Sequence, residues 1–165
     1  MKKKTINKRY IPKKLTQKDK KKQFKMIEKS KKEYKKGKYF TRKKLSSFKS
    51  KKSNHIENAQ KMYKIDNIKP SKELSKKTGC TLSTLKKIEK KGQGAYFSSG
   101  SRPNQTSHSW GRARLASALT AGKAGAVDYN ILMEGCKSNS KGRKMAELAK
   151  KKYGYGKRKV PKTKI

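Results

Sequence analysis

The positive charge of this 165-residue chain is distributed unevenly, and this distribution limits what the chain can fold into. The formal net charge is +40, from 50 Lys and Arg residues against 10 Asp and Glu residues. Residues 1–52 hold 24 of the basic residues, whereas residues 92–136, the near-neutral segment, hold four. Repulsion between lysines opposes a compact structure. A specific shape is therefore expected in the near-neutral segment, and an anionic partner is expected for the rest.

The composition also limits the size of the core. Apolar residues make up 30% of the chain, where roughly 45–50% is usual for globular proteins. We expect the longest basic stretches to be disordered alone, and to become ordered only on an extensive partner of opposite charge. We expect no signal peptide, because no apolar run follows the lysines at positions 2–4. We also expect no membrane span, because no apolar run approaches the roughly 20 residues that a span needs.

Capping residues and helical spacing predict a mainly α fold. Thr16, Ser53 and Ser71 are placed to cap helices, while Gly37 and Gly79 are placed to end them. Helices are predicted over residues 16–34, 53–63, 71–78, 82–91, 106–121, 124–133 and 141–152, with a loop over residues 92–105. The predicted parts are a long, extended basic arm with one marginal helix (1–52), a small helical domain (53–136) and a basic tail with a short helix (137–165).

Residues 71–91 resemble a helix-turn-helix. Two short helices meet at Gly79, with the small residue Ser75 four positions earlier and apolar residues around the turn. In that arrangement the second helix lies in a DNA groove. The groove-facing residues would be Thr81, Ser83, Thr84 and Lys87. The alternative is an ordinary helical hairpin that packs without contacting DNA.

Arginine is placed where lysine is scarce. Seven of the 50 basic residues are Arg, and three of these, Arg102, Arg112 and Arg114, lie in the near-neutral segment. The planar guanidinium matches phosphate or carboxylate groups bidentately. Together with Lys123, these arginines are candidates for binding an anion or a partner. The alternative is that they bind carbonyls and aromatic rings of the chain itself, or pair with the segment's two carboxylates.

Scattered aromatic residues in the arm are candidate anchors on a partner surface. The helix predicted over residues 16–34 has a thin apolar stripe, so it is marginal in water unless it packs on a surface. The candidate anchors are Phe24, Tyr34, Tyr39, Phe40 and Phe48.

Residue types that carry catalysis or bind metals are few. Cys80 and Cys136 are far apart in the sequence, and we expect them to be free and buried, with a disulfide as the alternative. His55 and His108 have no recognisable catalytic spacing, and two His with two Cys do not form a usual metal site. We therefore expect no enzymatic activity, no metal, no cofactor and no small-molecule substrate.

Several segments of the chain together form a specific pattern. They are residues 39–44 (YFTRKK), 47–53 (SFKSKKS), 70–80 (PSKELSKKTGC), 94–106 (GAYFSSGSRPNQT), 109–111 (SWG) and 126–129 (AVDY). This pattern, which covers roughly residues 10–136, resembles a family of small basic proteins encoded by large nucleocytoplasmic DNA viruses. The family has no known function, so the resemblance implies a viral context and assigns no catalytic residue.

Two hypotheses about function follow. The first is a non-enzymatic structural protein of a giant-virus particle, a minor capsid or internal virion component whose lysine-rich arms bind acidic capsid surfaces or DNA. The second is a nucleic-acid-binding protein that condenses or regulates viral DNA through residues 71–91 and the lysine arms. The expected partners are capsid or other virion proteins and nucleic acid. The expected location is the virion and, during assembly, the interior of the infected cell.

Overall fold

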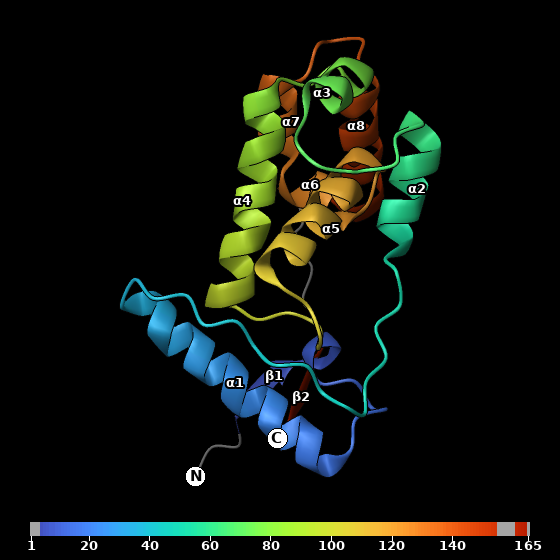
Figure 1. Cartoon of the computed structure of the whole chain (residues 1–165). Helices are drawn as coiled ribbons and strands as arrows, with labels where there is room; N and C mark the ends of the chain where they lie inside the picture. Colours follow the sequence, from blue (N-terminus) through green and yellow to red (C-terminus); the bar gives the residue numbers. More distant parts are fainter. Residues whose placement is uncertain (1–3, 155–160, 165) are drawn as a thin grey trace. The chain divides into compact units, whose positions relative to one another are not determined.

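The computed structural model of the chain describes residues 4–154 and 161–164. It is mainly helical, as the sequence predicted (Figure 1). The chain divides into two compact units, and each is described separately. Unit 1 comprises Met1–Lys51, Gln93–Trp110 and Lys159–Ile165, and unit 2 comprises Lys52–Gly92 and Gly111–Arg158. Residues 1–3 of the expected arm and residues 155–160 and 165 of the expected tail lie outside the described residues.

Unit 1 joins the two ends of the chain. Strand β1 (Thr5–Asn7) pairs with β2 (Lys162–Lys164) in an antiparallel, two-stranded sheet. Ile6 lies opposite Thr163 in this sheet. A short 3-10 helix (Lys8–Tyr10) follows β1. The sequence had predicted an extended arm over this region and had given no partner for it.

Helix α1 (Gln17–Lys35) is the main element of unit 1. The predicted cap is confirmed, because the Thr16 side chain accepts a hydrogen bond from the backbone N–H of Asp19 at 3.2 Å. Ile27 packs in one small apolar cluster with Ile6 and Ile11, and Met26 packs in another. The surface that this marginal helix needs is therefore supplied by the chain itself.

The segment after α1 has no regular secondary structure over residues 38–51, yet side-chain contacts hold it within unit 1. Leu45 is buried with Leu15 and Met26. The side chain of Asn104 accepts a hydrogen bond from the backbone N–H of Leu45 at 2.7 Å and donates one to the carbonyl of Phe48 at 2.7 Å. Side-chain clamps thus replace backbone pairing in this segment.

Unit 2 is a small helical bundle. Its elements are α2 (Asn54–Tyr63), α3 (Lys72–Thr78), most of α4 (Leu82–Ser98) and α5 (Ser107–Leu119), α6 (Lys123–Val127), α7 (Tyr129–Gly135) and α8 (Lys141–Tyr153). The predicted caps Ser53 and Ser71 are confirmed, since each side chain accepts a hydrogen bond from the first turn of its helix. Leu74, Leu85 and Leu115 lie in the main apolar cluster. One contiguous core therefore holds the helices of unit 2 together.

The prediction that a helix ends at Gly92 is wrong, and so is the first half of the loop predicted over residues 92–105, whereas residues 99–105 lie outside the helices as predicted. Helix α4 continues through Gly92 to Ser98. A methyl group at position 92 would lie 2.7 Å from the Cα of Gly111. Gly92 therefore serves close packing of α4 against α5, and a glycine inside a helix was mistaken for a glycine that ends one.

The single helix predicted over residues 124–133 is also wrong, because the chain leaves helical geometry at Asp128. Helices α6 and α7 meet at this residue, whose φ is −97° and ψ is 19°. Asp128 is 1% exposed. Its carboxylate is bound to Arg114, at 2.7 and 2.9 Å. A buried ion pair thus fixes the backbone where the sequence suggested a continuous helix.

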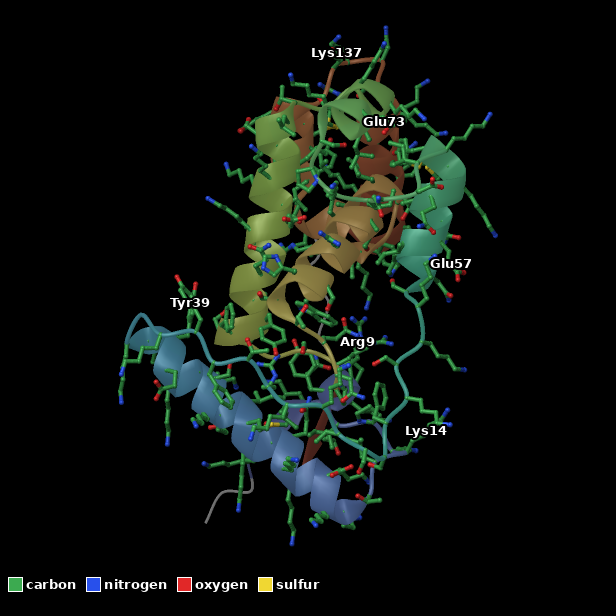
Figure 2. All side chains as sticks on the ribbon, in the orientation of Figure 1. Arg9, Lys14, Tyr39, Glu57, Glu73 and Lys137 are labelled. Atoms are coloured by element: carbon green, nitrogen blue, oxygen red, sulfur yellow. A yellow bond between two sulfur atoms is a disulfide. The ribbon has the colours of Figure 1, made fainter. Side chains whose placement is uncertain are left out.

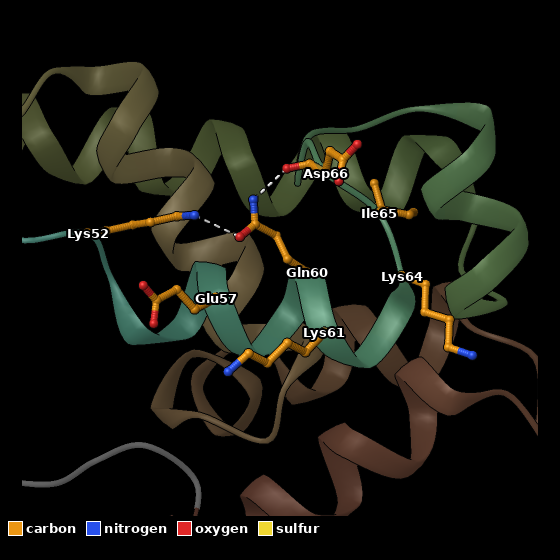
Figure 3. Close-up of a pocket in the computed structure, with 7 residues that line it drawn as sticks. All are labelled: Lys52, Glu57, Gln60, Lys61, Lys64, Ile65 and Asp66. Atoms are coloured by element: carbon orange, nitrogen blue, oxygen red, sulfur yellow. Dashed lines mark hydrogen bonds between the residues drawn. The ribbon is translucent and has the colours of Figure 1, made fainter.

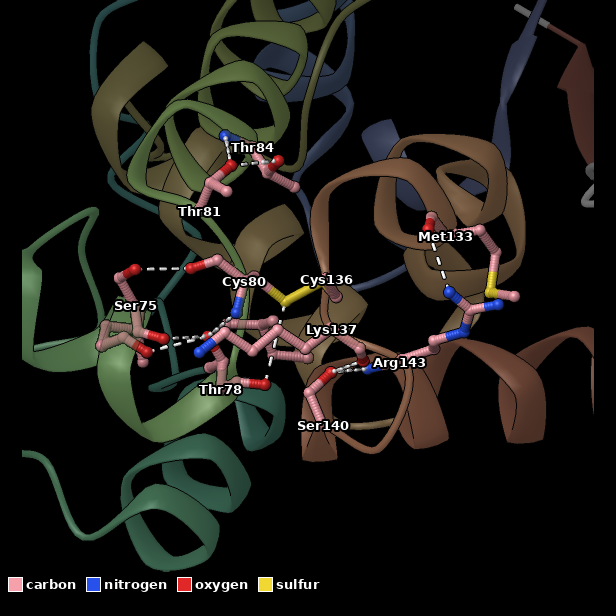
Figure 4. Close-up of a disulfide and its surroundings, with 12 residues drawn as sticks. Ser75, Thr78, Cys80, Thr81, Thr84, Met133, Cys136, Lys137, Ser140 and Arg143 are labelled. Atoms are coloured by element: carbon pink, nitrogen blue, oxygen red, sulfur yellow. Dashed lines mark hydrogen bonds between the residues drawn. A yellow bond between two sulfur atoms is a disulfide. The ribbon is translucent and has the colours of Figure 1, made fainter.

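The expectation of free cysteines is wrong, because Cys80 and Cys136 form a disulfide (Figure 4). The turn between α3 and α4 meets the end of α7 in a short antiparallel bridge. The backbone N–H of Thr81 donates to the carbonyl of Gly135 at 2.9 Å, and that of Lys137 donates to Gly79 at 2.9 Å. The fold brings together two cysteines that are 56 residues apart in the sequence.

Candidate functional site

One side of α1 carries a continuous row of lysines. The opposite side, with Gln23, Met26 and Ile27, is buried in unit 1. The row comprises Lys18, Lys21, Lys22, Lys25, Lys29, Lys32 and the C-cap residue Lys36, all exposed. Residues three and four apart share one side of a helix, so these ammonium groups form a single surface, the α1 lysine face. Such a concentration of like charge attracts an anionic ligand.

An open hollow lies on the α1 lysine face. The residues around it are Lys4, Phe24, Lys25, Glu28, Lys29, Lys32, Glu33 and Lys36. Five of these eight side chains are cationic and two are anionic. The Nζ of Lys4 lies 5.8 Å from the centre of the Phe24 ring. The hollow is therefore suited to the surface of a polyanion, which needs distributed positive charge more than enclosure.

The five candidate anchors fall into two groups. Phe24, Phe40 and Phe48 are partly buried against the small apolar clusters of unit 1. Tyr34 and Tyr39 are exposed, and Figure 2 shows Tyr39 projecting from its segment. The three phenylalanines are thus partly covered by the chain itself, and the two tyrosines are the more exposed candidates for contact with a partner.

Arg42 is a buried cation that the sequence did not single out. It is 6% exposed, and burial lowers the pKa of its guanidinium. The guanidinium donates to the hydroxyls of Ser30 and Ser101, at 3.0 and 2.7 Å, and to the carbonyl of Tyr96 at 2.8 Å. One signal was present: residues 1–52 contain only two arginines among 24 basic residues, Arg9 and Arg42.

The residues proposed to face a DNA groove do not all lie on the surface. Thr81, Ser83 and Lys87 are exposed. Thr84 is 6% exposed, and its side chain fills the space in which a Cβ of Gly135 would lie. Thr84 therefore packs in unit 2 and is not available to a groove. Its hydroxyl is hydrogen-bonded to Thr81 at 2.7 Å.

Helix α4 nevertheless presents a basic surface. Lys86, Lys87 and Lys90 are exposed on the same side of the helix as Ser83. Gly79, whose φ is 75°, ends α3 in the left-handed conformation that the predicted turn requires. The turn is fixed further by the Ser75 hydroxyl, which donates to the carbonyl of Cys80. Two helices thus meet at a left-handed glycine turn as predicted, and the exposed side of the second helix carries lysines.

The four basic residues of the near-neutral segment are divided between the two units. Arg102 lies in unit 1, whereas Arg112, Arg114 and Lys123 lie in unit 2. Arg102 and Arg112 are exposed. Arg114 is bound bidentately to buried Asp128, as the alternative interpretation predicted. Its guanidinium therefore has a partner inside the unit.

Another hollow lies beside α2 in unit 2 (Figure 3). Gln60 is at its centre: Lys52 donates to the side-chain oxygen at 2.9 Å, and the side-chain nitrogen donates to the carbonyl of Asp66. The lining side chains are Lys52, Glu57, Gln60, Lys61, Lys64, Ile65 and Asp66. Because three cationic and two anionic side chains line it, this hollow is less suited to a polyanion than the α1 lysine face.

The residues of possible catalytic interest are engaged in structural contacts. Both cysteines are in the disulfide. His108 Nδ1 lies 3.2 Å from the side-chain nitrogen of Gln93 in unit 1. Among residues 4–154 and 161–164, no three His, Cys, Asp or Glu side chains gather as metal ligands would. In the same part of the chain, every helix is too short or too polar to cross a membrane.

Comparison with known proteins gives one family. A model described as a family of unknown function, DUF5824, matches residues 7–131. This range includes the α1 lysine face, Arg42 and the basic side of α4. No curated protein and no solved structure matches the chain. Since the match spans well over half of its length, the chain belongs to the DUF5824 family, whose function is unknown.

Proposed function

We propose that this protein is a non-enzymatic structural component of a large DNA virus particle, a minor capsid or internal virion protein that binds DNA or acidic capsid surfaces. The observation that carries the proposal is the α1 lysine face. One side of α1 is fixed in unit 1, so the lysines of its other side are displayed on an ordered scaffold. The chain has 50 basic residues and only 10 acidic ones, so ion pairs within the chain cannot neutralise this surface. An anionic partner is needed to do so.

The ordering of the arm changes how the charge is interpreted. From the sequence alone, an ordered arm required an extensive partner. Contacts within unit 1 now account for the order of residues 4–51, through Leu45, Arg42 and the sheet between β1 and β2. The lysines are therefore not needed to hold the arm in place, and they remain available to a partner.

The disulfide supports the virion over the cell interior as the final location. Disulfides persist in oxidising environments, which include virion surfaces, and are rare in the cytosol and nucleus. Cys80 and Cys136 are joined across the core of unit 2. A protein that regulates DNA only inside the infected cell has less use for such a bond. The viral context itself rests on the resemblance of residues 94–106 and the accompanying segments.

Fractionation of purified particles tests the proposal. We expect the protein to remain with DNA-free shells at moderate salt, in a fixed ratio to the major capsid protein, if capsid surfaces are its main partner. Release together with the genome assigns it instead to the internal DNA, still within the virion. Absence from particles that carry their full set of structural proteins would rule the proposal out.

A second function, duplex DNA binding through α3 and α4, is favoured by the basic side of α4. Ser83, Lys86, Lys87 and Lys90 are exposed along one side of this helix, directly after the Gly79 turn. A helix so placed enters the major groove with its N-terminal residues toward the bases. Condensation or regulation of viral DNA would then use this helix for docking and the lysines of α1 for phosphates.

A matched charge reversal tests the second function. Lys86→Glu with Lys87→Glu should weaken duplex binding more than Lys21→Glu with Lys22→Glu, which makes the same charge change on α1. Fluorescence anisotropy with a labelled duplex at several salt concentrations measures both. Equal losses in the two variants would show that only general electrostatic attraction is involved.

A further inference from the structure

Three aromatic rings of unit 1 form a cluster at the end of α1. The rings of Tyr34 and Phe97 are stacked, with centres 6.0 Å apart and planes inclined by 12°. Tyr39 contacts the same Phe97 ring, with centres 5.1 Å apart. The two tyrosines are also neighbours, at 6.2 Å. Phe97 is therefore the shared base on which both tyrosines rest.

The cluster is exposed on its outer side. Tyr39 is 72% exposed and Tyr34 is 37% exposed, whereas Phe97 is 9% exposed. Figure 2 shows the Tyr39 side chain pointing away from the ribbon. Single exposed aromatic residues are common, but two tyrosines supported by one buried ring form an oriented aromatic surface.

The turn that ends α1 holds the two tyrosines in place. The backbone N–H of Gly37 donates to the carbonyl of Tyr34 at 3.0 Å, and that of Lys38 donates to Glu33 at 2.9 Å. Tyr39 directly follows this turn. The spacing between the two rings is thus set by backbone hydrogen bonds as well as by ring contacts, so little order has to be gained on binding.

Three lysines lie between or beside the two tyrosines in the sequence. Lys35, Lys36 and Lys38 are exposed in the same turn. Lys36 also ends the α1 lysine face, whereas Tyr34, seven residues after the buried Ile27, lies on the other side of α1. The positive charge beside the two tyrosines is therefore that of the turn itself. Aromatic rings beside a basic track are the arrangement with which proteins bind single-stranded nucleic acid, bases on the rings and phosphates on the cations.

We propose that Tyr39 and Tyr34 form a stacking platform for the unpaired bases of single-stranded nucleic acid, with Lys35, Lys36 and Lys38 binding the flanking phosphates. Unpaired bases expose the flat faces that such rings accept, whereas a duplex buries those faces between neighbouring base pairs. The platform is sequence-tolerant, because every base has a π-face. This proposal rests on the proposed function, because it names single-stranded nucleic acid as the chemical class of the polyanion that the α1 lysine face binds.

Two probes with the same number of phosphates separate stacking from charge. One is a fluorescein-labelled oligo(dT) of about 12 nucleotides, within the usual site sizes, and the other is an abasic oligomer of equal length. Anisotropy titrations of the full chain are carried out at about 0.2 M salt, where electrostatic binding is weakened. We expect the wild-type protein to bind oligo(dT) more tightly than the abasic oligomer.

Tyr39→Ala should lower the affinity for oligo(dT) roughly 5- to 100-fold, the effect of losing one stacked base, and leave the abasic affinity unchanged. Tyr39→Phe keeps the ring and should retain the preference. Lys38→Ala should instead weaken both probes and reduce the salt dependence by about 0.7 in slope. Because Tyr39 and Lys38 are both exposed, none of these changes should affect folding, which far-UV circular dichroism verifies.

Each failure has its own pattern. Equal affinity of the wild-type protein for the two probes, or an unchanged oligo(dT) affinity in Tyr39→Ala, overturns the platform and leaves nucleic-acid binding by the lysines intact. Failure to bind either probe at any salt concentration overturns the platform and removes single-stranded nucleic acid as a ligand. Duplex DNA and acidic capsid surfaces would then remain as the partners of the proposed function.

Discussion

The guanidinium of Arg42 lies 3.8 Å from the centre of the Tyr96 ring, and its Nη1 donates to the Tyr96 carbonyl at 2.8 Å. The Tyr96 hydroxyl in turn accepts the backbone N–H of Arg42 at 3.0 Å. Tyr96 is fully buried. These contacts tie the segment after α1 to the end of α4 within unit 1. A cation bound by neutral oxygens and an aromatic face thus lies at the centre of this unit.

Replacing Arg42 should destabilise unit 1 strongly. Arg42→Met keeps much of the side-chain volume but leaves Ser30, Ser101 and the Tyr96 carbonyl without their donor, at a cost of about 3 kcal/mol. Urea unfolding followed by the fluorescence of Trp110, the chain's one tryptophan and a residue of unit 1, measures this. Lys43→Met, at an exposed position, should change stability by less than about 0.5 kcal/mol. Equal stability of the two variants would contradict the role assigned to Arg42.

The local parts of the fold could be predicted from the sequence. Thr16, Ser53 and Ser71 cap helices as expected, because a capping hydroxyl acts on residues two or three positions away. The helix ending at Gly79 is equally local. Features that depend on distant residues could not be predicted. Gly92 lies inside a helix because α4 packs closely against Gly111, and Thr84 is buried because its side chain fills the space beside Gly135.

The candidate site shows the same limit. The exposed tyrosines and the basic composition were visible in the sequence, but the sequence could not show that α1 buries one side and displays the other. The residue type set Arg42 apart from the neighbouring Lys43, but nothing in the sequence showed that Arg42 is buried and Lys43 exposed. Arg114 was found as a candidate for anion binding, and its anion is Asp128 of the same chain.

The disulfide should contribute substantially to the stability of unit 2. It closes a loop of 56 residues, for which loop-closure entropy gives about 4 kcal/mol. Cys80→Ser with Cys136→Ser should therefore lower the urea midpoint followed by far-UV circular dichroism. A reductant should shift the wild-type protein in the same direction and leave the double variant unchanged. Rapid labelling of both cysteines in the folded, unreduced protein would contradict the bond.

Two glycines of α4 should respond oppositely to the same substitution. Gly92→Ala places a methyl group 2.7 Å from the Cα of Gly111, and separating the helices should cost about 1–3 kcal/mol. At Gly94 the nearest atom is the Tyr34 hydroxyl at 3.5 Å, an ordinary contact. Gly94→Ala should therefore be neutral or stabilising by up to about 1 kcal/mol, through helix propensity. Thermal unfolding of both variants measures the contrast, and a stable Gly92→Ala protein would contradict the close packing of α4 against α5.

Acid should weaken unit 1 through Asp19. The backbone N–H and the hydroxyl of Ser47 both donate to its carboxylate, and these hydrogen bonds hold the pKa of Asp19 below its ordinary value of 3.8. At a pH between the folded and unfolded pKa values of Asp19, the unfolded state binds more protons than the folded state. The stability that these hydrogen bonds contribute is therefore complete above pH 3.8 and is lost as the pH falls through the lower, folded pKa. Asp19→Asn should be less stable than the wild-type protein at neutral pH, with a difference that shrinks below pH 3.8 in urea titrations followed by Trp110 fluorescence. Asp66→Asn makes the same change in net charge within unit 2 and serves as the control. If the stability difference between Asp19→Asn and the wild-type protein stayed constant down to the lowest pH, the Ser47 contacts would not depend on the charge of Asp19.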